Sequence, residues 1–448
     1  MHDRRFLVPL IAASALVQLA LAIRFFGFYT GDDVEVLAEA FRVARGFSYR
    51  AWDIRNLFVP DFIVAPPVWL ATRLGVSDTR TLIVIATLPF IALSSLTIAF
   101  VHALALRWSQ RFIGAPGTLV AARAAALLFA LHWIPLGFGS TVYPRVVAMA
   151  CIAAAALLLE TREEGWAAVA AGALAGVAFA DRFSEIVFLA PLLLVAQRRA
   201  VHVALGAVAT IGLLVGGYDW ITWGEPFGSA IRFARLTLVA PDFASRVKMQ
   251  SPLWYLETLP RWIALTLLPL LWYARRLRAP WLYVLVPLVA LSLVRHKELR
   301  YLQGIIPFAM ILAGIGYAAM PRRRIAHALL ALSLVWQLYG LRFLERKTQP
   351  AVEAAQLVAR DPDVHAVVMS QLWAYGDRLY FTDQREVLDV TTPPRDLATA
   401  LRFAQAACLY ESDVDANVRA TLAQSGFREV QTFRAGKARD VVVYRRIH

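Results

Sequence analysis

Charged side chains are scarce in this chain of 448 residues, since Asp, Glu, Lys and Arg make up 17% of it while hydrophobic residues make up 59%. Soluble globular domains carry about 25% charged residues. Cysteine is scarcer still, because Cys151 and Cys408 stand alone and provide neither a disulfide framework nor the spacing of a metal site. These shortages exclude a soluble globular protein and a disulfide-stabilised fold, and they indicate an integral membrane protein.

Several motifs of soluble enzymes are also absent. No Walker or Rossmann glycine pattern follows a predicted strand, so a nucleotide site has no support. The chain has neither a G-x-S-x-G nucleophile elbow nor an H-E-x-x-H zinc helix. Its net charge of +14 lies in short arginine-rich loops between apolar runs, which is typical of contact with anionic lipid rather than nucleic acid. We therefore expect no nucleic-acid partner.

Long apolar runs are abundant instead, and the mean hydropathy of the chain is +0.56. A transmembrane helix needs about 17–25 such residues. The first run has a basic start but no clear small-x-small cleavage site, so we expect it to remain as a transmembrane helix. The sequence predicts a polytopic α-helical membrane protein with about eleven spans, at 6–24, 81–105, 119–137, 145–160, 165–180, 185–197, 200–218, 258–274, 279–294, 301–320 and 325–342.

The segment 56–75 is apolar but contains Asp61 and Pro66-Pro67, and we interpret it as a re-entrant or surface helix. The basic loops, from HDRR at 2–5 to PRRR at 321–324, then share one side, which the positive-inside rule makes cytoplasmic. Ionisable groups recur on the opposite face, where they indicate a functional site, although snorkelling to water explains any single loop. The loops on that face are 31–39, 50–55, 143–145, 181–185, 218–226 and 295–300.

The composition changes after the last apolar run. Residues 343–448 contain predicted helices at AVEAAQLVARD, ATALRFAQ and DANVRATLAQSG, and predicted strands at HAVVMSQ, DRLYFT, EVLDVT, ACLYES and DVVVYRRIH. We therefore predict two domains: a transmembrane domain at 1–342, with its first outer loop at about 25–80, and a soluble α/β domain at 343–448. An odd number of spans from a cytoplasmic N-terminus places this second domain outside the cytoplasm.

The first outer loop begins with Asp32 and Asp33, and Glu39 follows two helical turns after Asp32. A carboxylate at the water–lipid boundary, kept ionised by nearby arginines, is suited to act as a general base on a hydroxyl. We favour Asp32 for this role. The alternative is that either acid only caps the helix VEVLAEAFRVA, and for Asp33 the two interpretations are balanced. A divalent cation is compatible with paired acids, but no cofactor is required.

The stretch RHKELRY at 295–301 lies between two apolar runs. His296, Lys297 and Arg300 provide donors suited to a phosphate or pyrophosphate at the headgroup level, and Glu298 is suited to hold one of them in place. The alternative is an ordinary outer loop with salt bridges. A base on one loop and phosphate binders on another predict a lipid phosphate that carries a transferable group. The supporting residues that we expect from other outer loops are Arg145, Arg182 and Asp219.

The run HKELRYLQGIIPF resembles the HKE-x-RF…P element of the membrane mannosyltransferases that use dolichyl-phosphate-mannose to build GPI anchors and N-glycan precursors. The first outer loop of that family has H-P-D-E…E, then G, T-W-E-W and R-S…P. APPVWLATRLG is similar to the P-P-L-x-Y-W-L surface helix of protein O-mannosyltransferases and lipid A aminoarabinose transferases. The chain departs from the first pattern with TGDD for HPDE, AWD for TWEW and RN for RS. The matches in the first outer loop are Asp32-Asp33, Glu39, Gly46, Ala51-Trp52-Asp53, Arg55-Asn56 and Pro60.

This resemblance covers approximately 30–340 and implies a GT-C glycosyltransferase with an inverting mechanism. Asp32 would deprotonate an acceptor hydroxyl, which attacks the anomeric carbon opposite the phosphate through an oxocarbenium-like transition state. Polyprenyl phosphate is a good leaving group, so cations that receive its charge replace a general acid. The resemblance adds Arg55 to the phosphate binders, and Trp52 and Asp53 to the supporting residues.

The implied partners are a polyprenyl-phosphate-linked sugar, with mannose favoured, and a lipid, glycan or protein acceptor. Arginine-rich and alanine-rich usage indicates a high-GC bacterium, so we expect the inner (cytoplasmic) membrane, with the active site facing the periplasm or exterior. Two other functions stay open at this point. One is a transporter or flippase of lipid-linked sugars, which should carry more polar residues within its spans than these runs have. The other is a non-catalytic membrane protein whose C-terminal domain binds a partner.

Overall fold

The computed structural model describes residues 3–25, 29–46, 54–239, 249–344, 349–370, 386–390, 396–434 and 439–447. The chain divides into two units. The first unit contains Met1–Ala20, Trp52–Ile63 and Leu88–Arg342, and the second contains Leu21–Ala51, Val64–Thr87 and Phe343–His448.

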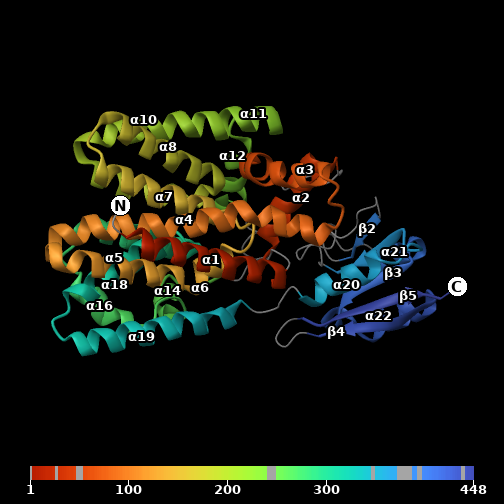
Figure 1. Ribbon diagram of the computed structural model, residues 1–448. Helices are drawn as coiled ribbons and strands as arrows, with labels where there is room; N and C mark the ends of the chain where they lie inside the picture. Colours follow the sequence, from red (N-terminus) through yellow and green to blue (C-terminus); the bar gives the residue numbers. More distant parts are fainter. Residues whose placement is uncertain are drawn as a thin grey trace. The chain divides into compact units, whose positions relative to one another are not determined.

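The first unit is built from helices, most of which run side by side in Figure 1. Its longer helices are α1 (Arg4–Phe25), α4 (Thr79–Ile113), α5 (Ala115–Ala130), α7 (Arg145–Thr161), α8 (Gly165–Asp181), α10 (Ala200–Ile211), α17 (Arg278–Leu293), α18 (Ile306–Ala319) and α19 (Arg323–Tyr339), of which α1 and α4 extend into the second unit. Short helices connect them: α6 (Trp133–Phe138), α9 (Leu189–Ala196), α11 (Tyr218–Trp223), α12 (Gly228–Ala234), α14 (Trp254–Glu257), α15 (Leu259–Trp262) and α16 (Leu268–Tyr273). Single turns of 3₁₀-helix are η2 (Phe183–Phe188), η3 (Gln197–Arg199), η6 (Leu265–Leu267), η7 (Leu299–Leu302) and η8 (Gly340–Phe343), and π-helical turns are η1 (Pro60–Val64), η4 (Gly212–Gly217) and η5 (Arg235–Val239).

Four helical runs in the described part of the chain are long and apolar enough to cross a membrane: Arg4–Phe25, Thr79–Ile113, Phe183–Trp223 and Arg323–Phe343. Helix α10 exposes Val201, Leu205 and Val208 along one side, each at least 60% accessible. Contact with lipid accounts for such an apolar stripe, because hydrocarbon does not penalise exposed aliphatic side chains. Helix α18, in contrast, is buried along almost its whole length. The first unit is therefore the helical body of a multi-pass membrane protein, as predicted.

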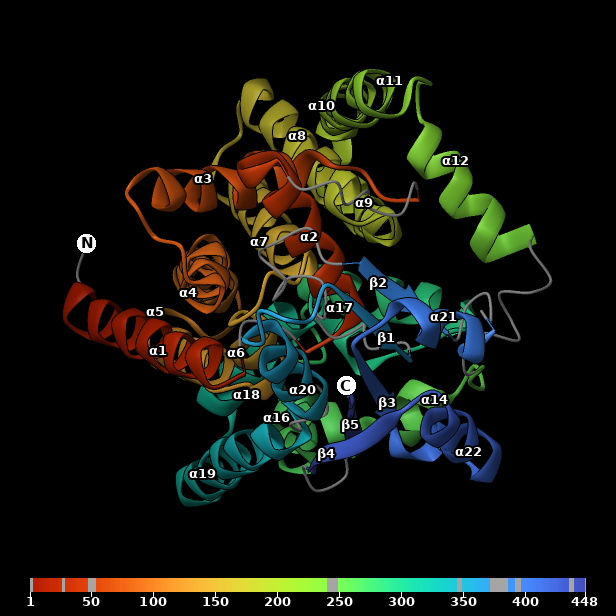
Figure 2. The same ribbon diagram turned by 90° about the vertical axis from the view of Figure 1, so that its right-hand side faces the viewer.

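Helices α8 and α10 lie side by side in Figures 1 and 2. They pack backbone against backbone. A Cβ atom added at Gly172 of α8 would lie 1.9 Å from the carbonyl oxygen of Val203, and one added at Gly206 of α10 would lie 2.0 Å from that of Val169. Helices in lipid associate through such small residues because close approach gains van der Waals contact. A side chain at either glycine would force this pair of helices apart.

The apolar segments 258–274, predicted as a span, and 56–75, predicted as a re-entrant or surface helix, each consist of short helical pieces. The run 258–274 is divided into α15, η6 and α16, because Pro260 and Pro269 each stand near the start of a new helix. The segment 56–75 contains η1 and then α3 (Ala65–Arg73), in which the proline pair occupies the first turn. Neither segment is among the runs long enough to cross a membrane on their own.

The second unit contains α2 (Gly31–Arg45), which packs on α3, and an α/β part after Phe343. The α/β part has a five-stranded sheet in the order β2-β1-β3-β5-β4. Strands β2 (Glu386–Asp389), β1 (Ala366–Met369) and β3 (Ala406–Tyr410) are parallel, whereas β5 (Val441–Arg446) and β4 (Phe427–Phe433) join antiparallel. The helices of this part are α20 (Gln349–Ala359), α21 (Leu397–Phe403) and α22 (Ala416–Gln424), with a 3₁₀ turn, η11 (Glu411–Asp413).

Each face of this sheet carries its own apolar core. Ala354 and Val358 of α20 pack on one face, whereas Leu401 of α21 and Leu422 of α22 pack on the other. This arrangement follows from period-two alternation in the strands, as in β3, where neighbouring residues enter different cores. Strand β4 is an addition to the predicted elements, and the predicted strand DRLYFT lies outside the described residues.

Candidate active site

The two acids at the start of α2 have different surroundings. Asp33 is fully buried, and its Oδ2 accepts hydrogen bonds from the backbone N–H of Tyr29 at 2.8 Å, the backbone N–H of Thr30 at 2.9 Å and the Thr30 hydroxyl at 3.1 Å. These bonds are those of a capping box, in which the residue at the third helical position closes the helix start. The capping interpretation therefore describes the bonds of Asp33, while Asp32, one position earlier, is half-buried.

Glu39 lies on the same helix as Asp32 and is buried. Its carboxylate accepts from Nε of Arg42 at 2.9 and 3.0 Å and also from the other guanidinium nitrogen of that residue. This pair is one turn apart on the helix, a spacing that brings the two side chains together. The structure therefore gives Glu39 an arginine partner on α2.

Arg145, the first residue of α7, is held in a buried ion pair in the first unit. Its guanidinium donates to the carboxylate of Glu185 and, at 2.8 Å, to the hydroxyl of Ser184. The side chains of Arg145 and Glu185 are 4% and 2% exposed. A buried charge requires such a partner, because the interior cannot replace its hydration. Two of the predicted outer loops, 143–145 and 181–185, therefore meet.

Two contacts between an arginine and a tyrosine join the loop at 295–301 to the segment that contains Arg145. The guanidinium carbon of Arg145 lies 4.4 Å from the ring centre of Tyr301, and that of Arg300 lies 5.3 Å from the ring centre of Tyr143. Both distances are within the range of cation–π attraction. We call these four residues the arginine–tyrosine clamp. The clamp joins the start of α7 to η7, so the predicted arginines of two different loops lie in one cluster.

Glu298 contacts two other residues of the charged loop. Its carboxylate accepts from Nε of Arg300 and lies 3.5 Å from Nε2 of His296, and its carbonyl accepts from the hydroxyl of Tyr255 at 3.4 Å. His296 also pairs with Met249 in an isolated antiparallel bridge. The loop is therefore fixed at both ends, with the carboxylate of Glu298 between a histidine and an arginine.

Lys297 is bound to the backbone around its own loop. Its side chain is buried, and its ammonium donates to the carbonyl of Val294 and, at 3.3 Å, to that of Gln250. Burial lowers the pKa of this lysine from its ordinary value of 10.5. The bonds of Lys297 are those of a loop brace, the alternative that the sequence left open for this stretch.

A second cluster joins the predicted Asp219 to Asn56, the residue that follows the predicted Arg55. The carboxylate of Asp219 is fully buried and accepts from Asn56, the neighbour of Arg55, and from Ser229. Arg182 follows α8 directly, and its backbone N–H closes that helix on the carbonyl of Ala178. The predicted Trp52 and Asp53 lie outside the described residues.

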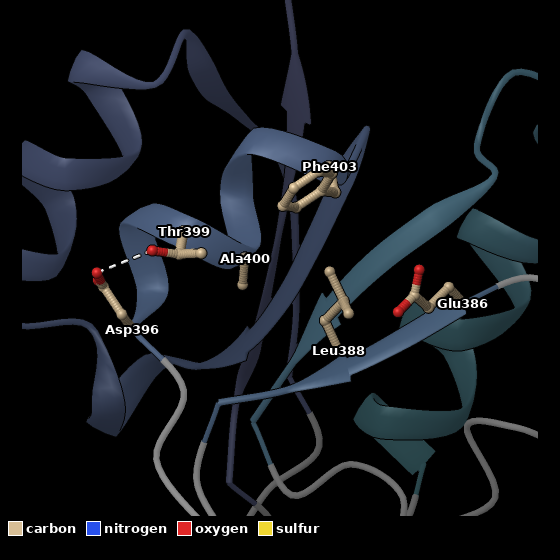
Figure 3. A pocket seen from close by; sticks show the side chains of 6 residues that line it. All are labelled: Glu386, Leu388, Asp396, Thr399, Ala400 and Phe403. Atoms are coloured by element: carbon tan, nitrogen blue, oxygen red, sulfur yellow. Dashed lines mark hydrogen bonds between the residues drawn. The ribbon is translucent and has the colours of Figure 1, made fainter.

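The described residues contain no group of three His, Cys, Asp or Glu side chains placed to hold a metal ion. A surface pocket of about 490 Å³ lies between β2 and α21 in the second unit (Figure 3). Asp396 at its edge caps α21, because it accepts from the Thr399 hydroxyl at 2.9 Å and from the backbone N–H of Ala398 at 3.1 Å. Two of the described residues that line it are acidic and none of them is basic; these residues are Glu386, Leu388, Asp396, Thr399, Ala400 and Phe403.

A sequence profile of the Alg9-like mannosyltransferase family matches residues 46–346, which include both the Arg55 cluster and the arginine–tyrosine clamp. The chain belongs to this family. The resemblance inferred from its motifs is thereby confirmed, and so is the expected enzyme class, a glycosyltransferase.

Among curated proteins, GPI mannosyltransferase 3 of Yarrowia lipolytica is 25% identical over 177 residues, which are 38% of this chain and 34% of that protein. The chain thus matches about a third of the length of this curated relative.

Three solved structures show the fold. ArnT from Cupriavidus metallidurans matches with a TM-score of 0.65 in the form bound to undecaprenyl phosphate and 0.64 in the apo form, at 14% and 16% identity, each over at least 98% of both chains. The oligosaccharyltransferase of Archaeoglobus fulgidus matches with a TM-score of 0.52 at 9% identity, over 98% of this chain and 76% of that one. The family member described here therefore shares the fold of GT-C membrane enzymes.

Several residues of these clusters were not predicted. Glu185, Tyr143 and Tyr301 contact the predicted arginines, and Asn56 contacts the predicted Asp219. All four lie in the predicted loops 143–145 and 181–185, in the stretch RHKELRY or directly after Arg55. The sequence signal that could have found them is the presence of an acidic or aromatic residue beside an arginine in several of the predicted outer loops. Which acid pairs with which arginine depends on contacts between distant residues, and local spacing does not contain that information.

Proposed function

We propose that this member of the Alg9-like mannosyltransferase family transfers a mannosyl residue from a polyprenyl-phosphate donor to a hydroxyl group of an extracytoplasmic glycolipid, glycan or protein. The family match over residues 46–346 carries the proposal. The bound state of one structural relative, ArnT with undecaprenyl phosphate, supports a polyprenyl lipid as the carrier.

In the proposed reaction, the Asp32 carboxylate accepts the proton of the acceptor hydroxyl, whose oxygen forms a bond to the anomeric carbon. The bond from that carbon to the phosphate oxygen breaks at the same time, and polyprenyl phosphate leaves with the electron pair. Asp32 is preferred to Asp33 because Asp33 already accepts three hydrogen bonds at the helix start. A phosphate leaving group needs no general acid and no cofactor, only cations that receive the developing charge.

Arg300 and Arg55 are the proposed cations for the donor phosphate, with His296 beside Arg300. An arginine presents a planar fork that binds two phosphate oxygens at once. The clamp places the guanidinium of Arg300 over the ring of Tyr143, and the second cluster binds the backbone of Arg55. Lys297 is assigned to bracing the loop, since its ammonium binds two backbone carbonyls. Arg145 and Glu298 orient the loop on which Arg300 stands.

The proposed topology has a cytoplasmic N-terminus, about eleven spans and the active site on the periplasmic side of a bacterial inner membrane. Residues 1–342 form the transmembrane domain and residues 343–448 a soluble domain on the same side as the active site. The arginine-rich loops support this orientation, because it places them together in the cytoplasm.

The experiment is a transfer assay in membranes that contain the protein, with radiolabelled polyprenyl phosphates that carry mannose, glucose or aminoarabinose. We expect the label to move from the mannose donor to a membrane product, and not in membranes from which the gene is deleted. Transfer from another sugar donor alone would overturn the choice of mannose. If none of the three donors supports transfer, the donor class is wrong.

A further inference from the structure

The side chain next to Arg55 has its hydrogen-bonding groups engaged. Asn56 is 7% exposed, and its Nδ2 donates to Oδ1 of Asp219 at 2.9 Å and to the carbonyl oxygen of Leu214 at 2.7 Å. Its Oδ1 accepts from the backbone N–H of Phe58 at 2.9 Å. Two donors and one acceptor directed to three different partners leave the amide one orientation, so this residue fixes the backbone on which Arg55 stands.

Asp219 extends this connection to a third segment. Its Oδ2 accepts from the backbone N–H of Ser229 at 2.9 Å and from the Ser229 hydroxyl at 2.6 Å. The carboxylate is fully buried, and the groups of Asn56 and Ser229 that donate to it are neutral. A buried carboxylate is retained at such a place only when hydrogen bonds compensate for its lost hydration. Asp219 therefore joins the loop at 54–58, helix α11 and helix α12.

The peptide of Arg55 itself is bound to the same helix. Nε1 of Trp223 donates to the carbonyl oxygen of Arg55 at 3.2 Å. Asp219 and Trp223 are four residues apart on α11, so they lie on one face of that helix. Successive residues of the loop, Arg55 and Asn56, are thus attached to successive turns of one rigid element. Such a double attachment sets both the position and the direction of the chain at Arg55.

The π-helical turn η4 (Gly212–Gly217) lies at this attachment point. Leu214, whose carbonyl binds Asn56, belongs to it, and α11 follows it directly. Single turns of π-helix inside longer helices are frequent at functional sites, because they release backbone groups from the regular pattern. Here the turn contains Leu214, whose carbonyl oxygen accepts from the Asn56 amide that fixes the Arg55 loop.

We propose that Asp219 is a positioning residue that acts through Asn56 to set Arg55 toward the phosphate of the lipid donor. This inference rests on the proposed function, in which Arg55 binds that phosphate. Holding a cation in place before the ligand arrives removes the ordering cost from the binding step. Asp219 itself contacts the loop and not the donor, so its loss changes donor affinity only as long as Arg55 is present.

The test is a double-mutant cycle on the full chain in detergent, with tritiated undecaprenyl phosphate as the probe and its Kd as the readout. Asp219→Asn keeps the size of the side chain but replaces one accepting oxygen by a donating NH₂ group. We expect this variant to raise the Kd about tenfold, and Arg55→Ala to raise it by at least as much. The double variant should bind no more weakly than Arg55→Ala alone.

Glu225→Gln is the matched control, because it removes a carboxylate from the turn between α11 and α12 where Glu225 forms a half-exposed pair with Arg232. Its Kd should equal that of the wild type. Thermal unfolding of every variant verifies that it folds. If Asp219→Asn does not fold, Ser229→Ala, which removes only the hydroxyl bond to Asp219, takes its place in the cycle with the same expected dependence on Arg55.

The results distinguish failure of Arg55 as a donor ligand from failure of Asp219 as a positioning residue. An unchanged Kd for Arg55→Ala would remove Arg55 from the donor site, and the inference with it. A raised Kd for Arg55→Ala, together with either an unchanged Kd for the Asp219 variant or a purely additive double variant, would overturn the positioning role of Asp219 alone. Non-additivity is the outcome that a general loss of stability does not produce.

Discussion

Removal of the charge of Glu185 should destabilise the protein more than any ordinary surface substitution. Glu185→Gln retains the shape of the side chain and an oxygen that can accept from Arg145, but it removes the negative charge. Arg145 would then remain ionised at 4% exposure without the carboxylate that supplies the negative charge of the pair. Its polar partners would then be the neutral glutamine oxygen and the hydroxyl of Ser184, at 2.8 Å.

The expected magnitude follows from this burial. Breaking a buried ion pair by removing one partner costs about 3–5 kcal/mol, because the other charge stays desolvated. The glutamine oxygen still accepts a neutral hydrogen bond from Arg145, so we expect the lower end, about 3 kcal/mol. That is a large fraction of the stability of a typical domain, about 5–15 kcal/mol. Because Arg145 also stacks on Tyr301 at 4.4 Å, the change should loosen the loop that carries Arg300.

Denaturant unfolding in detergent measures this difference. Glu160→Gln is the matched control, because Glu160, whose own side chain is 6% exposed, pairs at 2.7 Å with Arg111, whose side chain is 65% exposed. The arginine stays hydrated when its partner loses the charge, so we expect a cost of about 0–1 kcal/mol. A cost below about 1 kcal/mol for Glu185→Gln, equal to that of the control, would show that the Arg145 pair is solvated. The clamp would then lose its rigid base and our account of its geometry would be wrong.

The remaining predictions concern the charged loop and the topology. Arg300→Ala should raise the Kd for undecaprenyl phosphate about tenfold to a hundredfold, with Arg300→Lys intermediate, because a charge-assisted phosphate contact contributes about 1.5–3 kcal/mol; Arg295→Ala, on an exposed arginine of the same loop, is the control, and equal effects of the two alanine variants would refute the role of Arg300. Lys297→Met should lower stability by about 1–3 kcal/mol, because two carbonyls lose their donor, and should leave the Kd unchanged; a weaker lipid affinity without loss of stability would restore Lys297 as a phosphate ligand. Burial lowers the pKa of Lys297 in the folded protein below its ordinary value of 10.5. The charged form therefore reduces stability at pH values below the folded pKa, and this cost should disappear as the pH rises toward 10.5. Thermal unfolding of wild type and Lys297→Met at increasing pH should show this loss of the cost in the wild type alone. A cysteine in place of the exposed Asn417 on α22 should react with an impermeant reagent in intact cells, and protection until lysis would contradict an external C-terminal domain.

The helical body was largely predictable because membrane thickness imposes a fixed length on apolar runs. The run expected at 279–294 is α17 at Arg278–Leu293, and that expected at 165–180 is α8 at Gly165–Asp181. The run at 258–274 was equally apolar but is broken at two prolines. Strand β4 was missed because most of its residues are exposed and several are charged or polar, as edge strands often are.

The site was predictable as a set of loops and less so as a set of contacts. Charge at the helix ends identified Arg145, Arg300 and Glu298, and the structure brings these residues into one cluster. Charge at the helix ends does not indicate which cationic side chain is bound to other groups of the protein. Lys297 illustrates this, because its carbonyl partners are backbone groups that no sequence pattern marks. Glu185 lies 40 residues from its arginine, so only the folded chain reveals the pair.

The most direct test of the central claim compares two adjacent, identical substitutions in the mannosyl-transfer assay. Asp32→Asn removes the proposed base, so transfer of radiolabelled mannose from polyprenyl-phosphate-mannose should fall about 10²–10⁴-fold while thermal unfolding stays unchanged. Asp33→Asn should instead cost about 1 kcal/mol of stability through the weakened helix cap and retain most of the transfer. Near-normal transfer by Asp32→Asn, or loss of transfer only in Asp33→Asn, would contradict the account.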